Sequence, residues 1–358
     1  MGADIGSLEI TLAIRDTDQT IRFDELKLTD ARLSMVLGEN LRGRVLPSVG
    51  NGSWRLSDTF QKQHGVLIEK HREPVCIWTA IDYILSFEGG DVGSAYRFSY
   101  QNDLPAARYP ISSPYPSSEA VERLMTPVSL RELTNSFPIL LVNVKTGTSF
   151  YKMNSPTEFT RVGGSSIGAS TTTALGKSLV GKSSLSSMLQ AARALEKPSS
   201  ADLLVEDIYG GDCVSIGLPG SIIASCLGKA HQDARDSPDL SKSLLDMICI
   251  NTAQLAYLHA GLHKCRTVLI VGSVGEEPVL SECIQRVLHI LSGQKHEPLR
   301  AIFLKQSRHL GSLGALLRRE TLLRELSVPN VPMNTATVAD GVHDETYTKL
   351  RVGTSPKL

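Results

Sequence analysis

The stretch Ile139–Gly147, with the sequence ILLVNVKTG, is the clearest structural signal in the chain. It follows Pro138 and holds a nearly continuous apolar run that ends at a Lys-Thr-Gly turn. Such a run is typical of a strand that is buried on both faces of a sheet. Residues 267–272 (TVLIVG) and 300–304 (RAIFL) have the same character, so the sequence predicts an α/β protein with a covered sheet.

Other elements surround these strands. Residues 8–15 alternate apolar and polar side chains, as a half-buried strand does, and residues 21–26 are expected to form its hairpin partner. Apolar residues at helical spacing predict a long helix over residues 240–262. Further strands are expected at residues 66–68, 81–87, 149–153 and 158–162, and further helices at residues 119–125, 184–196, 201–208, 278–292 and 310–326.

The length and composition of the chain limit its class. At roughly 150 residues per domain, 358 residues favour two lobes. Lys and Arg together number 37, and so do Asp and Glu together, so the formal net charge is zero. We therefore expect neither nucleic acid nor an anionic membrane as a partner. No apolar stretch approaches the roughly 18 residues of a membrane span. We read no signal peptide, and the six cysteines lack C-x-x-C spacing, which predicts a soluble cytoplasmic protein with reduced thiols.

Three turns in which glycine follows a strand are candidates for binding an anion. They are Asp4-Ile5-Gly6-Ser7, the stretch 143–149 and Val271-Gly272-Ser273. A glycine at such a turn lets the backbone direct N–H groups at a phosphate, and an adjacent acid such as Asp4 can hold Mg²⁺. Most glycines of this kind merely make turns. Two hydroxyl-rich turns more than a hundred residues apart nevertheless favour a two-lobed fold that clamps a nucleotide between duplicated halves.

Several contiguous blocks recur in a known order along the chain. The longest is Asp207–Asp212 (DIYGGD), and the others are residues 4–6 (DIG), 161–168 (RVGGSSIG), 217–220 (GLPG), 224–225 (AS), 301–304 (AIFL) and 311–317 (GSLGALL). In these blocks, and in their order over about residues 1–326, the chain resembles the eukaryotic-type (type II) pantothenate kinases.

The resemblance implies an acetate-and-sugar-kinase/Hsp70/actin-like (ribonuclease H-like) α/β fold with two lobes and ATP in the cleft. It implies an N-terminal lobe with the first phosphate loop at residues 1–136, a C-terminal lobe with the second loop at 137–328, and a flexible tail at 329–358. The implied activity is transfer of phosphate from Mg-ATP to the hydroxyl of pantothenate, the first step of coenzyme A synthesis. The implied assembly is a homodimer inhibited by acyl-CoA, with the helix at 240–262 available for the dimer.

The resemblance also implies roles for individual residues. Glu119 is the best match for the general base and Glu122 is the second choice; the alternative for Glu119 is a solvated acid at a helix start. Arg161 offers a planar donor fork that suits an anionic oxygen, and a surface salt bridge is its alternative role. The nucleotide phosphates and Mg²⁺ are expected at Asp4, Gly6 and Ser7, the rest of the nucleotide at Gly147, Gly168, Ser170, Thr171 and Gly272, and pantothenate or acyl-CoA at Thr146, Ser149 and Arg161.

The glycine loops depart from the family pattern. The family's Asp-Ile-Gly-Gly-Thr reads DIGSL at residues 4–8, its Asn-Ile-Gly-Ser-Gly reads NVKTG at 143–147, and its glycine run reads GAST at 168–171. Each added side chain narrows the space in which a phosphate approaches backbone N–H groups. Two hypotheses follow: an active pantothenate kinase, or a catalytically weakened subunit that pairs with an active paralogue as a heterodimer. Lys145 is a candidate for a compensating positive charge.

A histidine pair on the long predicted helix has a spacing that zinc sites also use. His259 and His263 lie four residues apart and close to Cys265. No acidic residue lies between the two histidines, and the sequence offers no evident second pair of ligands. Packing or surface exposure is therefore favoured over metal binding.

Overall fold

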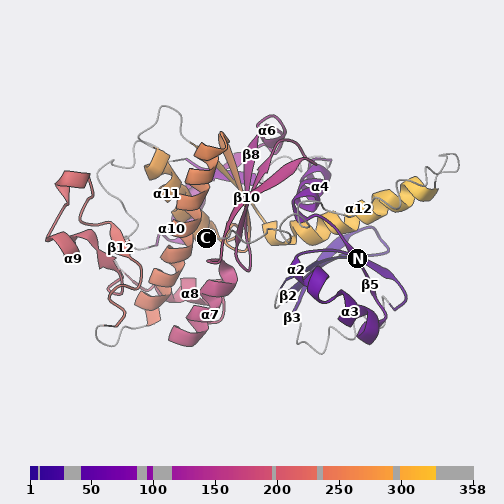
Figure 1. The fold of residues 1–358 in the computed structure, drawn as a ribbon, viewed down its shortest axis with the longest axis horizontal. Helices are drawn as coiled ribbons and strands as arrows, with labels where there is room; N and C mark the ends of the chain where they lie inside the picture. The colour runs from indigo at the N-terminus through magenta and orange to yellow at the C-terminus, as the bar shows by residue number, and fades with distance from the viewer. Residues whose placement is uncertain are drawn as a thin grey trace, which may run out of the picture. The chain divides into compact units, whose positions relative to one another are not determined.

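Two mixed β-sheets built on one plan form the frame of the computed structural model (Figure 1). Contacts divide the chain into two compact units, Met1–Arg318 and Arg319–Leu358, and the packing described below lies in the first. The tail expected at residues 329–358 lies outside the described residues. The structure describes residues 1–6, 9–27, 42–86, 95–99, 115–195, 199–231, 237–292 and 299–327.

The first sheet has the strand order β3-β2-β1-β4-β5. β1 is its central strand, with the antiparallel strands β2 and β3 on one side and the parallel strands β4 and β5 on the other. The hairpin of β2 and β3 confirms the two strands predicted near the start of the chain. The bounds are β1 Gly2–Ile5, β2 Glu9–Arg15, β3 Ile21–Lys27, β4 Val45–Val49 and β5 Leu67–Lys70.

The second sheet repeats this plan around β8, in the order β10-β9-β8-β13-β14-β6-β7. β9 and β10 are antiparallel on one side of β8, and β13 and β14 are parallel on the other. This duplication confirms the predicted fold class. β6 and β7 add an antiparallel pair beyond β14. The bounds are β6 Ala95–Phe98, β7 Met125–Val128, β8 Ile139–Val144, β9 Thr148–Met153, β10 Phe159–Ser165, β13 Thr267–Gly272 and β14 Arg300–Leu304.

Helices cover both faces of the second sheet, with α10 and α11 on one side and α4 with the first turns of α12 on the other (Figure 1). The structure confirms the helices predicted at residues 240–262, 278–292 and 310–326, which are α10, α11 and α12. Their bounds are α4 Glu73–Leu85, α10 Ser237–Leu262, α11 Pro278–Ser292 and α12 Leu310–Ser327.

The strand β8 is buried along its whole length because its two faces meet different cores. Leu140 and Val142 pack in the cluster that contains the α10 and α11 residues, whereas Ile139 and Leu141 pack in the cluster that contains α4 and α12. Burying a leucine or isoleucine side chain fully contributes roughly 1.5–3 kcal/mol. Both cores therefore depend on this strand, and its apolar run needs no alternation.

The strand predicted at residues 81–87 is wrong. Residues up to Leu85 form the end of α4, which starts at Glu73 with Pro74 in its first turn. The buried side chains Ile77, Ala80 and Ile81 follow helical spacing, so the short apolar run at the end of the helix resembles a strand only when it is taken apart from its beginning.

The remaining elements are short. The helix predicted over residues 201–208 is instead a short strand followed by one turn of helix, because Leu203 and Leu204 pair with β12. The bounds are α2 Asn51–Arg55, α3 Ser57–Thr59, η1 Phe60–His64, α5 Ser118–Leu124, α6 Arg131–Thr134, α7 Ala169–Val180, α8 Leu185–Ala192, β11 Leu203–Leu204, α9 Val205–Tyr209, η3 Val214–Ile216, β12 Ile223–Ser225 and η4 Ser307–His309.

Buried polar groups anchor the irregular segment 199–231 to α10. The carboxylate of Asp202 accepts hydrogen bonds from the hydroxyl of Ser243 and, at 3.1 Å, from the backbone N–H of Leu227. Burial raises the pKa of Asp202 to about 6, although the hydrogen bond from Ser243 opposes the shift. The segment therefore carries an ionisable group that folding makes more basic.

The substitution Asp202→Asn is expected to remove one pH dependence of stability. Because burial raises the carboxyl pKa from 3.8 to about 6, the folded chain holds a proton between these pH values that the unfolded chain releases. The free energy of unfolding of the wild type should therefore fall by about 3 kcal/mol, relative to the variant, as the pH rises through this window. Urea unfolding at a series of pH values measures this difference. The difference in free energy of unfolding between the two proteins should stay constant outside the window. If it also stays constant within the window, the prediction is contradicted.

Candidate functional site

The carboxyl ends of β8 and β13 meet at one edge of the second sheet. Gly272 lies opposite Val144, and the backbone N–H of Ser273 donates to the carbonyl oxygen of Val144 at 3.0 Å. Gly272 has φ of 93°, and a Cβ there would overlap that same carbonyl oxygen. The hydroxyl of Ser307, which follows β14, accepts from the N–H of Gly272 at 3.1 Å. Ligands of open α/β sheets bind at this edge, so Gly272 lies where the nucleotide is expected.

The turn between β8 and β9 packs directly against the start of α7. The backbone N–H of Ala169 donates to the carbonyl oxygen of Lys145 at 2.7 Å. Gly168 is the N-cap residue of α7, and a Cβ on Gly168 would lie 2.5 Å from the Cα of Gly147. The two predicted nucleotide-binding glycines are therefore in contact. They bring a helix N-terminus, with its free N–H groups, to the turn.

Hydroxyl groups surround this turn. Thr146 is exposed at its tip, and Ser149 is half-buried on β9, opposite Asn143. Ser170 and Thr171 lie in the first turn of α7, where the hydroxyl of Thr171 donates to the carbonyl oxygen of Ser166 at 2.6 Å. The structure thus gathers four of the predicted hydroxyl residues around the turn and the adjoining helix start.

Three charged groups meet at the centre of the site. Asp4 is buried near the end of β1, and Lys145 extends from the β8–β9 turn to contact its carboxylate. The Lys145 Nζ also donates to Glu73 Oε1 at 2.6 Å. Asp4 and Lys145 were predicted to take part, whereas Glu73 was not. The sequence signal that would have found Glu73 is the Glu-Pro pair at residues 73–74, which is typical of a helix start.

The two carboxylates keep the ammonium charged. Burial by itself lowers the pKa of Lys145, but Asp4 and Glu73 together hold it above its usual value. Burial raises the pKa of Glu73, but the charge of Lys145 and hydrogen bonds from Lys145 and Asn143 hold it below its usual value. Burial raises the pKa of Asp4 against the opposing effect of Lys145. The cluster is therefore a half-buried ammonium held between two carboxylates.

The surroundings of Asp4 do not fit a hydrated Mg²⁺. The Asp4 side chain is only 6% exposed, and Lys145 already contacts its Oδ2. A Cβ on Gly50 would lie 2.8 Å from Asp4 Oδ1, and one on Gly311 would lie 2.6 Å from Asp4 Oδ2, so any room beside these oxygens depends on the lack of a side chain at both glycines. Mg²⁺ keeps several of its water ligands and needs room for them. Among the described residues, no group of three or more His, Cys, Asp or Glu side chains could hold a metal.

The first phosphate turn is described only in part. Gly6 follows β1, and its carbonyl oxygen lies against Gly52 of α2. Ser7 lies outside the described residues. Gly6 therefore adjoins Asp4 at the end of β1, on the first sheet's side of the cluster.

Arg161 and Glu119 lie apart from the charged cluster. Arg161 is exposed on β10, and its guanidinium lies against Gly164, three residues further along the strand. Glu119 is exposed in the first turn of α5, where the hydroxyl of Ser117 caps the helix by accepting from the backbone N–H of Ala120 at 3.2 Å. In the described residues, no hydrogen bond or ion pair joins Glu119 to Asp4, Glu73 or Lys145. Glu122 is exposed on the same helix.

The histidine pair of α10 makes ring contacts. His259 stacks on Phe150 with ring centroids 4.9 Å apart, and His263 stacks on His259 at 5.9 Å. Burial, with the nearby His263, lowers the pKa of His259. His259 thus packs α10 against Phe150 of β9, and His263, which directly follows α10, stacks on His259.

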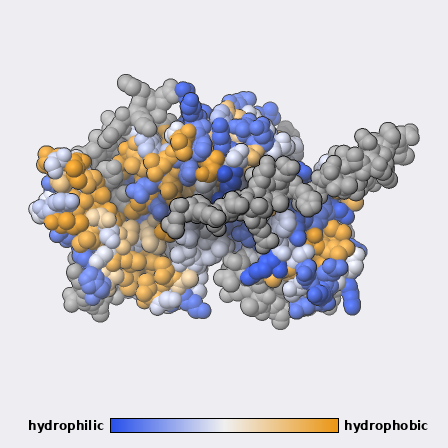
Figure 2. Space-filling model, viewed as in Figure 1, coloured by the Kyte–Doolittle hydropathy of each residue, from blue (hydrophilic) through white to orange (hydrophobic). Residues whose placement is uncertain are grey.

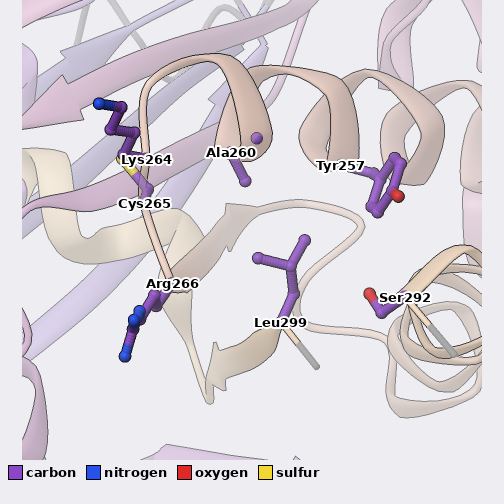
Figure 3. Close-up of a pocket in the computed structure, with 8 residues that line it drawn as sticks. Tyr257, Ala260, Lys264, Cys265, Arg266, Ser292 and Leu299 are labelled. Atoms are coloured by element: carbon purple, nitrogen blue, oxygen red, sulfur yellow. The ribbon is translucent and has the colours of Figure 1, made fainter. Parts of the chain in front are cut away.

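A cavity of about 190 Å³ lies at the opposite end of the sheet (Figure 3). It opens beside Arg266, which precedes β13, and Leu299, which precedes β14, so it lies at the amino ends of these parallel strands. It therefore is separate from the candidate site at their carboxyl ends. The lining residues are Tyr257, Ala260, Gly261, Lys264, Cys265, Arg266, Ser292 and Leu299.

None of the described helices has the length and apolar character needed to cross a membrane.

Known proteins are similar in sequence to most of this chain. A family model described as Fumble matches residues 10–318. The chain is 30% identical over 283 residues to "4'-phosphopantetheine phosphatase" of Mus musculus, which covers 78% of this chain and 31% of that protein. It is 27% identical over 293 residues to "Pantothenate kinase" of Schizosaccharomyces pombe, which covers 79% of this chain and 65% of that protein. The chain therefore spans from about a third to just under two thirds of the length of these curated relatives.

A search of solved structures finds sugar kinases. One is a ROK family glucokinase from Streptomyces griseus in complex with glucose and AMPPNP, which is 12% identical to this chain with a TM-score of 0.40. The match covers 88% of this chain and 96% of that one.

The substitution Gly272→Ala is expected to destabilise the chain more than Gly181→Ala. Both glycines have positive φ, 93° and 67°, which costs an alanine about 1–2 kcal/mol. A Cβ at Gly181 meets no atom within 4 Å, whereas one at Gly272 meets the backbone of Val144 and adds an overpacking cost of about 1–3 kcal/mol. Urea unfolding of both variants measures the two losses. Equal losses would show that the contact between β13 and β8 at Gly272 is not tight.

Proposed function

Because the chain belongs to the Fumble family, we propose that it takes part in the ATP-dependent phosphorylation of pantothenate to 4'-phosphopantothenate, the first step of coenzyme A synthesis. The relative from Schizosaccharomyces pombe is named a pantothenate kinase, whereas the one from Mus musculus is named a phosphatase. Membership of the family supports a kinase-type transferase activity. Pantothenate as the substrate is our proposal.

The observation that carries this proposal is the convergence of three backbone elements at one edge of the second sheet. The β8–β9 turn at Gly147, the start of α7 at Gly168 and the end of β13 at Gly272 lie together there. Turns and helix starts expose backbone N–H groups, which bind phosphate oxygens without the aid of a charged side chain. We assign this edge to the phosphates of ATP. Ser170 would add a hydroxyl donor from α7, and Thr171 would add another by turning its hydroxyl away from the carbonyl oxygen of Ser166.

Pantothenate carries a carboxylate at one end and the reacting hydroxyl at the other. We assign Arg161 to the carboxylate, because a guanidinium binds it with two parallel hydrogen bonds, and Thr146 and Ser149 to the polar groups between the ends. The hydroxyl oxygen would attack the γ-phosphorus, its proton would pass to a base, and ADP would leave. Glu119 remains the proposed base on the motif alone. Its exposed position in α5 means that the bound substrate, or a rearranged α5, must bring the two together.

The charged cluster favours a second candidate, a catalytically weakened subunit that works with an active paralogue. The ammonium of Lys145 neutralises Asp4, the acid that the family pattern assigns to the metal and phosphates. Electrostatic stabilisation of the transferring phosphoryl group is the main task of a kinase site, and a carboxylate held by a lysine is a poor ligand for Mg-ATP. In this form the chain would bind ligand or partner while the paralogue supplies turnover.

Exposed apolar side chains support a partner surface for either a homodimer or a heterodimer. On α9 and η3 the side chains of Ile208, Tyr209, Val214 and Ile216 are 52%, 57%, 86% and 61% exposed. Figure 2 shows apolar side chains gathered over this region of the molecule. Partner surfaces are commonly marked by apolar patches of this kind. We propose that such an assembly acts in the cytoplasm and that acyl-CoA inhibits it.

The two candidates differ in whether the purified chain phosphorylates pantothenate alone. For an active kinase, Arg161→Ala should raise the KM for pantothenate about 10- to 100-fold through the lost charged hydrogen bonds. Glu119→Ala should lower kcat about 100- to 10,000-fold if Glu119 is the base. A radiolabelled-ATP assay measures both, with Arg123→Ala, an exposed arginine of α5, as the matched control.

Activity that appears only after a paralogue is added would support the second candidate. If calorimetry detects no binding of ATP or pantothenate to the purified chain, and the chain does not change the activity of a paralogue, both candidate functions are refuted.

A further inference from the structure

We propose that the ammonium of Lys145 permanently takes the position between Asp4 and Glu73 that a divalent cation would otherwise occupy, so that this chain does not bind Mg²⁺ at Asp4. This inference concerns cation binding alone and holds whether or not the chain phosphorylates pantothenate. It replaces the expectation, taken from the family pattern, that Asp4 is a metal ligand.

The geometry brings a cation to two acids from a distant part of the chain. Asp4 lies near the end of β1 in the first sheet and Glu73 begins α4, whereas Lys145 lies in the β8–β9 turn of the second sheet. Lys145 Nζ contacts Asp4 Oδ2 and lies 2.6 Å from Glu73 Oε1. An ammonium has three N–H donors, and these two contacts use two of them. The lysine therefore bridges the carboxylates as a metal ion would.

The oxygens that hold the ammonium are those that a divalent cation prefers. Both are carboxylate oxygens, and the buried Asn143 hydrogen-bonds to one of these acids, Glu73. Carboxylate and amide oxygens are the ligands of Mg²⁺ and Mn²⁺ in proteins. With Lys145 present, however, a divalent ion would have to expel an ammonium whose pKa these acids raise.

The side chain of Lys145 also limits access to Asp4. A Cβ on Gly50 would lie 2.8 Å from one oxygen of Asp4, and a Cβ on Gly311 would lie 2.6 Å from the other, so both glycines lie beside the carboxylate. The Lys145 side chain, which is 25% exposed, lies over the remaining approach to Asp4 Oδ2. A hydrated divalent ion is larger than an ammonium and needs its waters in place. The site thus receives its cation from the chain itself, at any concentration of free metal.

The arrangement also gives Lys145 a positioning role. Its backbone carbonyl accepts from Ala169 at the start of α7, while its side chain holds Asp4 and Glu73. One residue therefore ties the phosphate-binding turn of the second sheet to the end of β1. In a metal-dependent site this link would form only when the ion is bound.

Binding of Mn²⁺ alone, without nucleotide, tests the proposal. Electron paramagnetic resonance titration should count the same number of bound Mn²⁺ ions in the wild type and in Asp4→Asn. Lys145→Ala should bind one additional Mn²⁺ per chain, about tenfold more tightly than the wild type or better, because a competing positive charge is gone. The double variant Asp4→Asn/Lys145→Ala should lose this ion. The matched control Lys177→Ala removes an exposed lysine of α7 and should behave as the wild type.

Either of two results would overturn the proposal: stoichiometric Mn²⁺ binding by the wild type that Asp4→Asn abolishes, or a folded Lys145→Ala variant that binds no more Mn²⁺ than the wild type. Lys145→Ala leaves the buried Asp4 and the half-buried Glu73 without a cation, so it should unfold at a lower temperature, and Mn²⁺ should raise that temperature in this variant only. Lys145→Arg keeps the charge and should exclude Mn²⁺ as the wild type does. If Lys145→Ala does not fold even with Mn²⁺, the comparison of the wild type with Asp4→Asn decides.

Discussion

The burial of β8 on both faces is the constraint on which the rest of this structure depends. Its alternate side chains complete two separate cores, one with α10 and α11 and the other with α4 and α12. A strand held in this way has little freedom to shift, because a shift of one residue would exchange every side chain between the cores. The turn that follows, at residues 145–147, is therefore presented at a defined place, against α7 and opposite β1. The candidate site is a consequence of how this strand ends.

A single side chain in that turn decides what the site can bind. A lysine in place of the family's glycine adds a cation between two acids, Asp4 and Glu73, that would otherwise require one. The formal charge of the whole chain is zero, so this compensation is local and does not reflect a basic surface. A buried pair of this kind costs desolvation energy and is weak evidence for stability. Its larger effect is on chemistry, since it occupies the carboxylate that a metal-dependent transfer would use.

The doubly buried strands and the amphipathic helices were predictable because a strong physical requirement shapes their sequences. The apolar runs at residues 139–144, 267–272 and 300–304 coincide with β8, β13 and β14. Short strands carry a weaker signal, and β4, β6 and β7 were missed, each being five residues or fewer. The end of α4 was predicted as a strand because a helix that is apolar over its last turns resembles one when its beginning is not recognised.

The sequence by itself determined the duplicated α/β plan, the glycine turns and the altered residues within them, because these follow from periodicity and from motifs that are contiguous in the chain. It also identified Asp4 and Lys145 as charged candidates. Only the tertiary structure decided that these two residues meet and that Glu73 joins them, since Lys145 is separated from Glu73 by 72 residues and from Asp4 by 141. That contact depends on how the two sheets approach each other. The sum of many packing contacts sets this approach, and no local pattern encodes it.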